Sequence, residues 1–151
     1  MGFAFFTLLN DDLGAINIYN NALPAQSASP LAINNYAFAL ARIGRTDEAK
    51  KALNTALRYE PSREEKLVIT ATFGLICFRE GYVEEGRTFY TDAGRGFELI
   101  KDFRSAAIAT YYWAVEEKRI NSQNAESKIK EAKREIERHN VFEFIDLAKK
   151  L

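Results

Sequence analysis

The sequence PLAINNYAFALARIGRTDEAKKALNTALRYEP, from Pro30 to Pro61, decides the fold. Gly44 divides it into two halves and ends a first helix, because glycine accepts the positive φ of a helix C-terminal cap. Thr46 is placed to cap a second helix, which Pro61 stops. The first half has apolar residues at the spacing of an α-helix, namely Ile33, Tyr36, Ala37 and Leu40. The stretch therefore predicts two helices joined by a short turn.

The pattern of the second helix recurs along the chain as a small residue, a large residue four positions later and a small residue three positions after that. Its four occurrences begin 34, 37 and 39 residues apart and comprise Ala15, Tyr19 and Ala22; Ala49, Leu53 and Ala56; Gly86, Tyr90 and Ala93; and Ala125, Ile129 and Ala132. Such recurrence is typical of a repeat protein, in which each hairpin buries its apolar face against its neighbours.

This hairpin of about 34 residues resembles the tetratricopeptide repeat (TPR). The residues that carry the resemblance are Ala37, Leu40, Gly44, Ala49, Leu53, Ala56 and Pro61. The resemblance implies an all-α fold, a right-handed superhelix of antiparallel helix-turn-helix hairpins. It implies about three and a half repeats and a C-terminal capping helix, and the alternative is an unrelated all-helical bundle.

The 151 residues suit a single domain. We expect a half repeat over 1–29, repeats over 30–63 and 64–100, an extended repeat over 102–138 and a capping helix within 141–151. The third hairpin lacks the turn glycine, and its first helix extends toward Ile120. The helices expected from this register are 2–9, 12–23, 30–43, 46–59, 64–80, 83–100, 102–119, 123–138 and 141–150.

Composition argues against catalysis and against several binding classes. Basic and acidic residues number 21 each, so no net field attracts nucleic acid or a membrane. The chain has one histidine, His139, and one cysteine, Cys77, which exclude the common zinc sites and an internal disulfide. We therefore expect no enzyme, no catalytic residue, no metal and no cofactor. A single thiol fits a reducing, cytoplasmic location.

In the TPR family the first helices line a concave groove, and the resemblance implies that this chain binds a peptide or helix of a protein partner there. Arg42 and Arg79 hold the same register position and suit an acidic group, because arginine grips a carboxylate with two hydrogen bonds. The expected function is that of a protein–protein interaction scaffold. Its groove residues would be Asn34, Asn35, Phe38, Arg42, Thr72, Leu75, Phe78, Arg79, Phe103, Thr110 and Trp113.

Two other functions stay open at this point. An RNA-binding helical repeat would need a basic track with stacking aromatic residues, which Arg42, Arg79, Arg104 and Trp113 supply only thinly, so we expect no nucleic acid partner. Self-assembly within a larger multidomain protein is the other function. No apolar stretch approaches the roughly 20 residues of a membrane span.

The apolar run MGFAFF at positions 1–6 lacks the basic region and cleavage site of a secretory signal. Extending the repeat register backward puts the run in the middle of a first helix. We therefore expect this chain to be the C-terminal part of a longer repeat protein. Its aromatic residues would leave apolar surface for another repeat or another copy of the chain, so a homo-oligomer through this helix is also expected.

Overall fold

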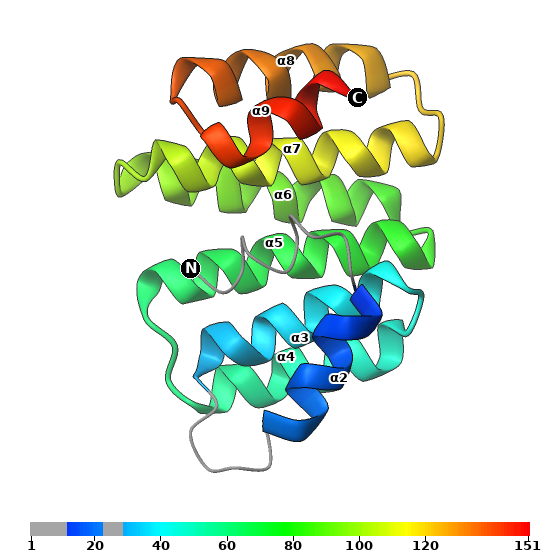
Figure 1. Ribbon diagram of the computed structural model, residues 1–151, viewed down its shortest axis with the longest axis vertical. Coiled ribbons are helices and arrows are strands. Elements are labelled where there is room, and N and C mark those ends of the chain that lie inside the picture. The colour runs from blue at the N-terminus through cyan, green and yellow to red at the C-terminus, as the bar shows by residue number, and fades with distance from the viewer. Residues whose placement is uncertain (1–11, 23–28) are drawn as a thin grey trace.

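The computed structural model describes residues 12–22 and 29–151. These ranges contain α-helices and no strand, so the prediction of an all-α fold is confirmed for them (Figure 1). The expected helix over 2–9 lies outside the described residues. The helices are α2 (Asp12–Ala22), α3 (Pro30–Arg42), α4 (Thr46–Arg58), α5 (Arg63–Glu80), α6 (Val83–Leu99), α7 (Phe103–Arg119), α8 (Ala125–Arg138) and α9 (Phe142–Lys149).

Consecutive helices pack in pairs, α3 with α4, α5 with α6 and α7 with α8. The first helices of successive pairs also contact each other, α3 with α5 and α5 with α7. At the two ends, α2 packs against α3 and α9 packs against α8 (Figure 1). The predicted bounds of these helices differ from the observed ones by at most two residues.

The first helix of each pair begins with a side-chain cap. Ser29 accepts a hydrogen bond from the Ala32 N–H, and Asp102 accepts one from the Ser105 N–H. Ser62 and Glu65 form a capping box, in which each side chain accepts the backbone N–H of the other. Such caps satisfy N–H groups that lack a partner inside the helix.

The predicted cap of the second helix at Thr46 is wrong. Thr46 is the first residue inside α4, and Arg45 holds the cap position without a side-chain cap bond. The reason lies in the turn: the Arg45 N–H bonds to the Leu40 carbonyl at 2.9 Å and closes the end of α3, which fixes Arg45 between the two helices.

Each of the six turns between α3 and α9 contains one residue with a positive φ. Glycine holds this position in two of them, with φ of 87° at Gly44 and 88° at Gly81. The third pair, which lacks a turn glycine, uses Asn121 at φ 51°, a conformation that asparagine tolerates better than most residues. The remaining turns use Glu60, Lys101 and Asn140. The C-cap of α7 is Ile120, as the predicted extension requires.

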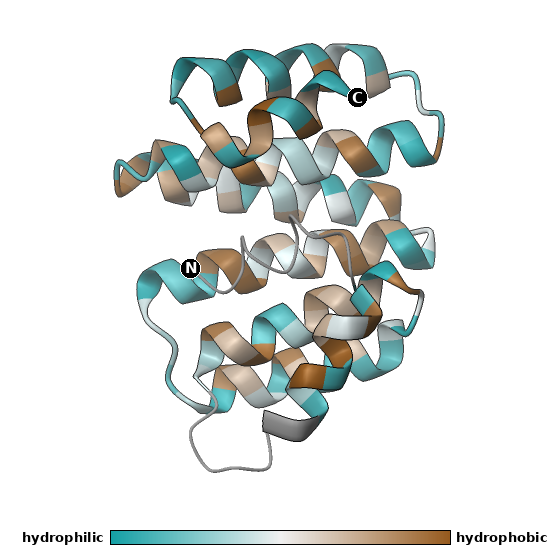
Figure 2. Ribbon diagram, viewed as in Figure 1, coloured by the Kyte–Doolittle hydropathy of each residue, from teal (hydrophilic) through white to brown (hydrophobic). Residues whose placement is uncertain are grey.

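Small residues allow close contact within the pairs. A Cβ atom on Gly86 of α6 would lie 2.6 Å from the Phe78 ring and 3.0 Å from the Gly74 carbonyl of α5. Ala37 and Ala49 are fully buried between α3 and α4. By contrast, α8 is the most hydrophilic of the long helices in Figure 2, and buries only Ala132 and Ile136 completely.

Candidate functional site

Three stripes of side chains, one on each first helix, form a largely buried layer that we call the inner face. Within a stripe the residues are four apart, and side chains at that spacing share one face of a helix. Corresponding residues of successive stripes are 37 apart in the sequence. The stripes are Asn34, Phe38 and Arg42 on α3; Ala71, Leu75 and Arg79 on α5; and Ile108, Tyr112 and Glu116 on α7.

The centre of the inner face is apolar and aromatic. The rings of Phe38 and Tyr112 meet edge to face, with centroids 4.9 Å apart, although they belong to α3 and α7. Leu75, from the same row on α5, is buried. Tyr112 also contacts Phe144 of α9 at 5.8 Å, so aromatic contacts run from α3 to the last helix. Burial raises the pKa of Tyr112 well above its usual value, which keeps this phenol neutral.

Asn34 lies at one edge of the inner face, one helical turn from Phe38. Its side chain is fully buried, and neither its Nδ2 nor its Oδ1 forms a hydrogen bond with any described residue. Leaving a buried amide unpaired costs about 1–3 kcal/mol. The side chain of the neighbouring Asn35 hydrogen-bonds the Tyr19 hydroxyl of α2, although its Oδ1 is likewise buried without a hydrogen-bond partner. Asn34 therefore keeps a polar group where packing alone would favour an apolar one.

Charged residues form the other edge of the inner face. Arg79 donates to both oxygens of Glu116, from Nε at 2.6 Å and from Nη2 at 3.0 Å. Its third donor, Nη1, bonds the Arg42 carbonyl at the end of α3 at 2.7 Å. Arg119 donates from Nε to Glu116 at 2.9 Å and from Nη2 to the Phe78 carbonyl near the end of α5. Arg42 itself pairs with Asp12 of α2 at 3.3 Å.

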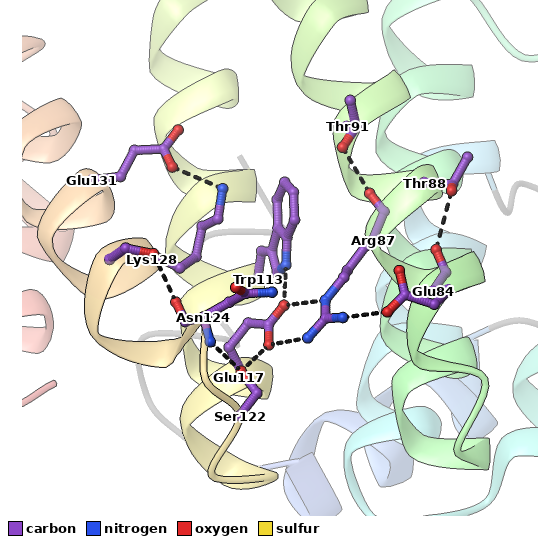
Figure 3. A network of polar contacts seen from close by, with 11 residues as sticks. Glu84, Arg87, Thr88, Thr91, Trp113, Glu117, Ser122, Asn124, Lys128 and Glu131 are labelled. Atoms are coloured by element: carbon purple, nitrogen blue, oxygen red, sulfur yellow. Dashed lines mark hydrogen bonds and ion pairs between the residues drawn. The ribbon is translucent and has the colours of Figure 1, made fainter.

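A second charged network lies between α6, α7 and the turn into α8 (Figure 3). Arg87 donates to both oxygens of the fully buried Glu117, at 2.8 and 3.0 Å. Trp113 Nε1 and Ser122 Oγ donate to the same carboxylate. Burial raises the pKa of Glu117, but the hydrogen bonds from Arg87, Ser122 and Trp113 outweigh it and hold this pKa at about 2. Glu117 is therefore ionised at neutral pH.

The same bridge occurs one pair earlier. Lys50 of α4 and Glu80 of α5 approach to 2.6 Å, and each lies 37 residues before its counterpart in the bridge between Arg87 and Glu117. Both bridges join the second helix of one pair to the first helix of the next. The earlier bridge is more exposed, with 40% of the Lys50 side chain accessible, compared with 22% of Arg87.

The residues predicted for a groove do not all lie on one surface. Phe38, Arg42, Leu75, Arg79 and Asn34 belong to the inner face, and Asn35 is buried beside α2. Phe78 is buried against Tyr90 of α6, and Trp113 stacks on the same Tyr90. Phe103, the first residue of α7, is 44% exposed and stacks on His139.

The two predicted threonines are occupied within their own helices. Thr72 donates its hydroxyl to the Val68 carbonyl, and Thr110 donates to the Ala106 carbonyl. Trp113 is also engaged, because Lys128 Nζ lies 3.5 Å from its ring centroid. A role of these residues in peptide binding remains a prediction.

Sequence reasoning missed the acidic partners and one aromatic residue. These are Asp12, Glu116, Glu117 and Tyr112, together with Arg87. A signal was present for some of them, since Glu116 and Tyr112 stand 37 residues after Arg79 and Leu75. The sign change from Arg79 to Glu116 in one register position marks an ion pair between successive first helices.

Comparison of the chain with protein-family models, with curated proteins and with solved structures finds no match in any of the three. Over residues 12–22 and 29–151, none of the helices is both long and apolar enough to cross a membrane. In the same ranges, no three His, Cys, Asp or Glu side chains gather where a metal ion could be held.

Proposed function

We propose that this chain is a non-catalytic interaction domain of TPR-like hairpins, and that its inner face receives a polypeptide segment of a protein partner. The observation that carries the proposal is the buried, unpaired amide of Asn34. An asparagine side chain offers one acceptor and two donors, which match the N–H and the C=O of a peptide group. The apolar row beside it, Phe38, Leu75 and Tyr112, is buried, so a segment would reach the amide only if this row moved aside.

The superhelical arrangement is part of the same proposal. Two features support it: the contact between Phe38 and Tyr112 across α5, and the bridge between Lys50 and Glu80 that recurs 37 residues later. If successive pairs meet through equivalent residues, each pair is rotated relative to the last by a similar amount, and the array curves. Rings of α3 and α7 that touch across α5 are expected on the inside of such a curve.

Binding of RNA has less support. Arg42 and Arg79 already contact carboxylates, and Trp113 lies between Tyr90 and Lys128. A stacking platform for bases needs an aromatic face that a base can reach. We therefore keep a polypeptide as the proposed partner.

A peptide selection tests the proposal. Random twelve-residue peptides displayed on phage are selected on the purified protein, and the affinity of the winners is measured for Asn34→Leu and for the control Asn54→Leu. Asn54 lies exposed on α4, away from the inner face. We expect about a tenfold or greater loss of affinity for Asn34→Leu and no loss for the control, since about 1.4 kcal/mol corresponds to a factor of ten. Equal affinity for both variants would remove the basis of the proposal.

A further inference from the structure

Exposed arginines recur on the second helices at the period of the repeat. Arg58 of α4, Arg95 of α6 and Arg134 of α8 stand 37 and 39 residues apart, the spacing at which the pattern of these helices also recurs. We call them the arginine row, and we infer that the row is a docking site for an acidic segment of a protein partner. The inference is independent of the proposed function, because the inner face lies on the first helices.

The geometry of the α-helix turns the arginine row toward solvent. Each arginine follows a fully buried alanine of its own helix by two positions; the alanines are Ala56, Ala93 and Ala132. Residues two positions apart lie on nearly opposite sides of a helix, since about 100° separates one residue from the next. All three arginines are exposed, with 68% of the Arg134 side chain accessible, so a partner can reach the row.

Helix packing brings the three arginines to one surface. Both α4 and α6 pack against α5, and both α6 and α8 pack against α7, so the second helices form a layer beside the first helices. Short turns join the helices from α4 to α8, so helices next to each other in the chain run antiparallel and the second helices all point in one direction (Figure 1). Residues of one register position therefore lie at the same level of this layer.

The arginine row carries positive charge that is open to a ligand. Within the part of the chain that the structure describes, Arg58 and Arg95 form no ion pair. Arg134 contacts only the neighbouring Glu135, in an exposed pair of the kind that adds little stability. The positions one and two turns before each arginine share its side of the helix and hold no acidic residue, while Lys51 and Lys130 add two cations there.

The helix dipole does not account for the arginine row. Cations stabilise the last turn of a helix, and Arg58 lies in the last turn of α4. The last turn of α6, however, has no basic residue, and that of α8 has only Arg138. Arg95 and Arg134 therefore stand outside the reach of this effect, and their shared position calls for another explanation.

An acidic group was expected from the sequence at Arg42 and Arg79. Those arginines pair with Asp12 and Glu116 of the chain itself, and only 2% of the Glu116 side chain is exposed. The arginine row is accessible, and arginine holds a carboxylate with two parallel hydrogen bonds. It contains no aromatic residue on which a base would stack, so a polypeptide suits it better than a nucleic acid does.

A peptide with regularly spaced carboxylates tests the inference on the full chain. The probe is a fluorescein-labelled peptide of sixteen residues in which Glu and Ser alternate, so that an extended chain presents all its carboxylates on one side. Its uncharged counterpart has Gln in place of Glu. Fluorescence anisotropy at pH 7 and low ionic strength measures both affinities, because salt would screen exposed charges. We expect the acidic peptide to bind at least about tenfold more tightly.

Two triple variants with the same change in net charge locate the site. Arg58→Gln, Arg95→Gln and Arg134→Gln together should weaken binding of the acidic peptide by at least about tenfold. The control combines Arg63→Gln, Lys101→Gln and Lys149→Gln, which remove three exposed cations outside the row, and it should retain the wild-type affinity. All six positions are exposed, and circular dichroism checks that both variants fold.

Three results would overturn the inference. They are the absence of saturable binding of the acidic peptide, an equal loss of affinity in both triple variants, and tighter binding of a twelve-nucleotide oligouridylate that depends on the same arginines. The last result would assign the row to nucleic acid. Asn34→Leu should leave binding of the acidic peptide unchanged, so failure of the arginine row and failure of the proposed function are distinguishable.

Discussion

At the scale of single residues, two buried polar side chains behave in opposite ways. Glu117 accepts hydrogen bonds from Arg87, Trp113 and Ser122, so its burial is well compensated. Asn34 is buried as deeply, and its amide has no partner among residues 12–22 and 29–151. Only the second arrangement costs stability without a structural return, which is why we propose a binding role for Asn34.

Replacing Asn34 with leucine should stabilise the protein. The change removes an unpaired amide and adds apolar contact of similar volume, so we expect the free energy of unfolding to rise by about 1–2 kcal/mol. Urea denaturation followed by circular dichroism measures it. The control is Asn54→Leu on the exposed surface of α4, which should change stability little. A destabilised Asn34→Leu protein would show that the amide has a structural partner.

The bonds to Glu117 predict a dependence of stability on pH. The pKa of this carboxyl is about 2 in the folded protein, below its ordinary value of 4.5. The unfolded chain therefore binds more protons between these values, and stability falls as pH falls. The contribution, about 3 kcal/mol, is present above pH 4.5 and is lost as pH decreases through 2. Denaturation of wild type and Glu117→Gln across pH 2–6 measures it; parallel curves for the two proteins would contradict the assignment.

At the scale of helices, contacts within a pair depend on how closely two backbones approach. Gly74 and Gly86 face each other across α5 and α6, and each lies against an aromatic ring of the other helix. The turns that join the helices depend on a different property, a single residue with positive φ. Neither requirement involves charge, whereas the contacts between pairs combine aromatic rings with ion pairs.

Substitution of Gly86 by alanine should destabilise the protein by about 1–3 kcal/mol. The added Cβ would lie 2.6 Å from Phe78 and 3.0 Å from the Gly74 carbonyl, and the backbone cannot give way as a side-chain end can. Gly94 of the same helix is the matched control, because its Cβ would meet nothing within 4 Å. There alanine should stabilise by about 0.5–1 kcal/mol. Thermal unfolding compares the two, and effects of the same sign would refute this packing.

At the scale of the whole molecule, charged side chains link the helix pairs whose helices pack through apolar residues. Arg79 links three first helices. It lies on α5 and donates hydrogen bonds to Glu116 of α7 and to the Arg42 carbonyl of α3. The bridges of Lys50 with Glu80 and of Arg87 with Glu117 join the second helices to the following pairs. Stability should therefore depend on these junctions as well as on each hairpin.

Replacing Arg79 with methionine should weaken the contacts that α5 makes with α3 and α7. The change leaves Glu116 buried with only Arg119, and we expect a loss of about 3–5 kcal/mol. Hydrogen exchange should show that amides of α3 and α4 lose protection more than those of α8. Arg45→Met, which breaks the exposed pair with Glu48, is the control and should leave exchange unchanged. Uniform loss of protection in Arg79→Met would argue against a junction at this residue.

The helices could be predicted from the sequence, but the ion pairs between them could not. Local period, turn glycines and prolines place each described helix end within two residues, because these signals act over a few positions. The bonds of Glu116 and Glu117 join residues 30 and 37 apart in the sequence and depend on how helices of different pairs are aligned. Phe78 and Trp113 show the same limit. Each lies on a first helix as predicted, but its side chain contacts Tyr90 of α6. The apolar period of the sequence does not fix the rotation of a helix about its axis to within one residue.

The bridge that occurs twice, 37 residues apart, gives the central hairpin of α5 and α6 matching residues at its two ends. A second copy of residues 66–102, inserted after Asp102, would keep the turn between the helix pairs and place Arg87 of the original against Glu80 of the copy, and Arg87 of the copy against Glu117. The copied Leu75 would join the row of Phe38 and Tyr112. Duplication of this segment would therefore extend the chain through interfaces that it already has.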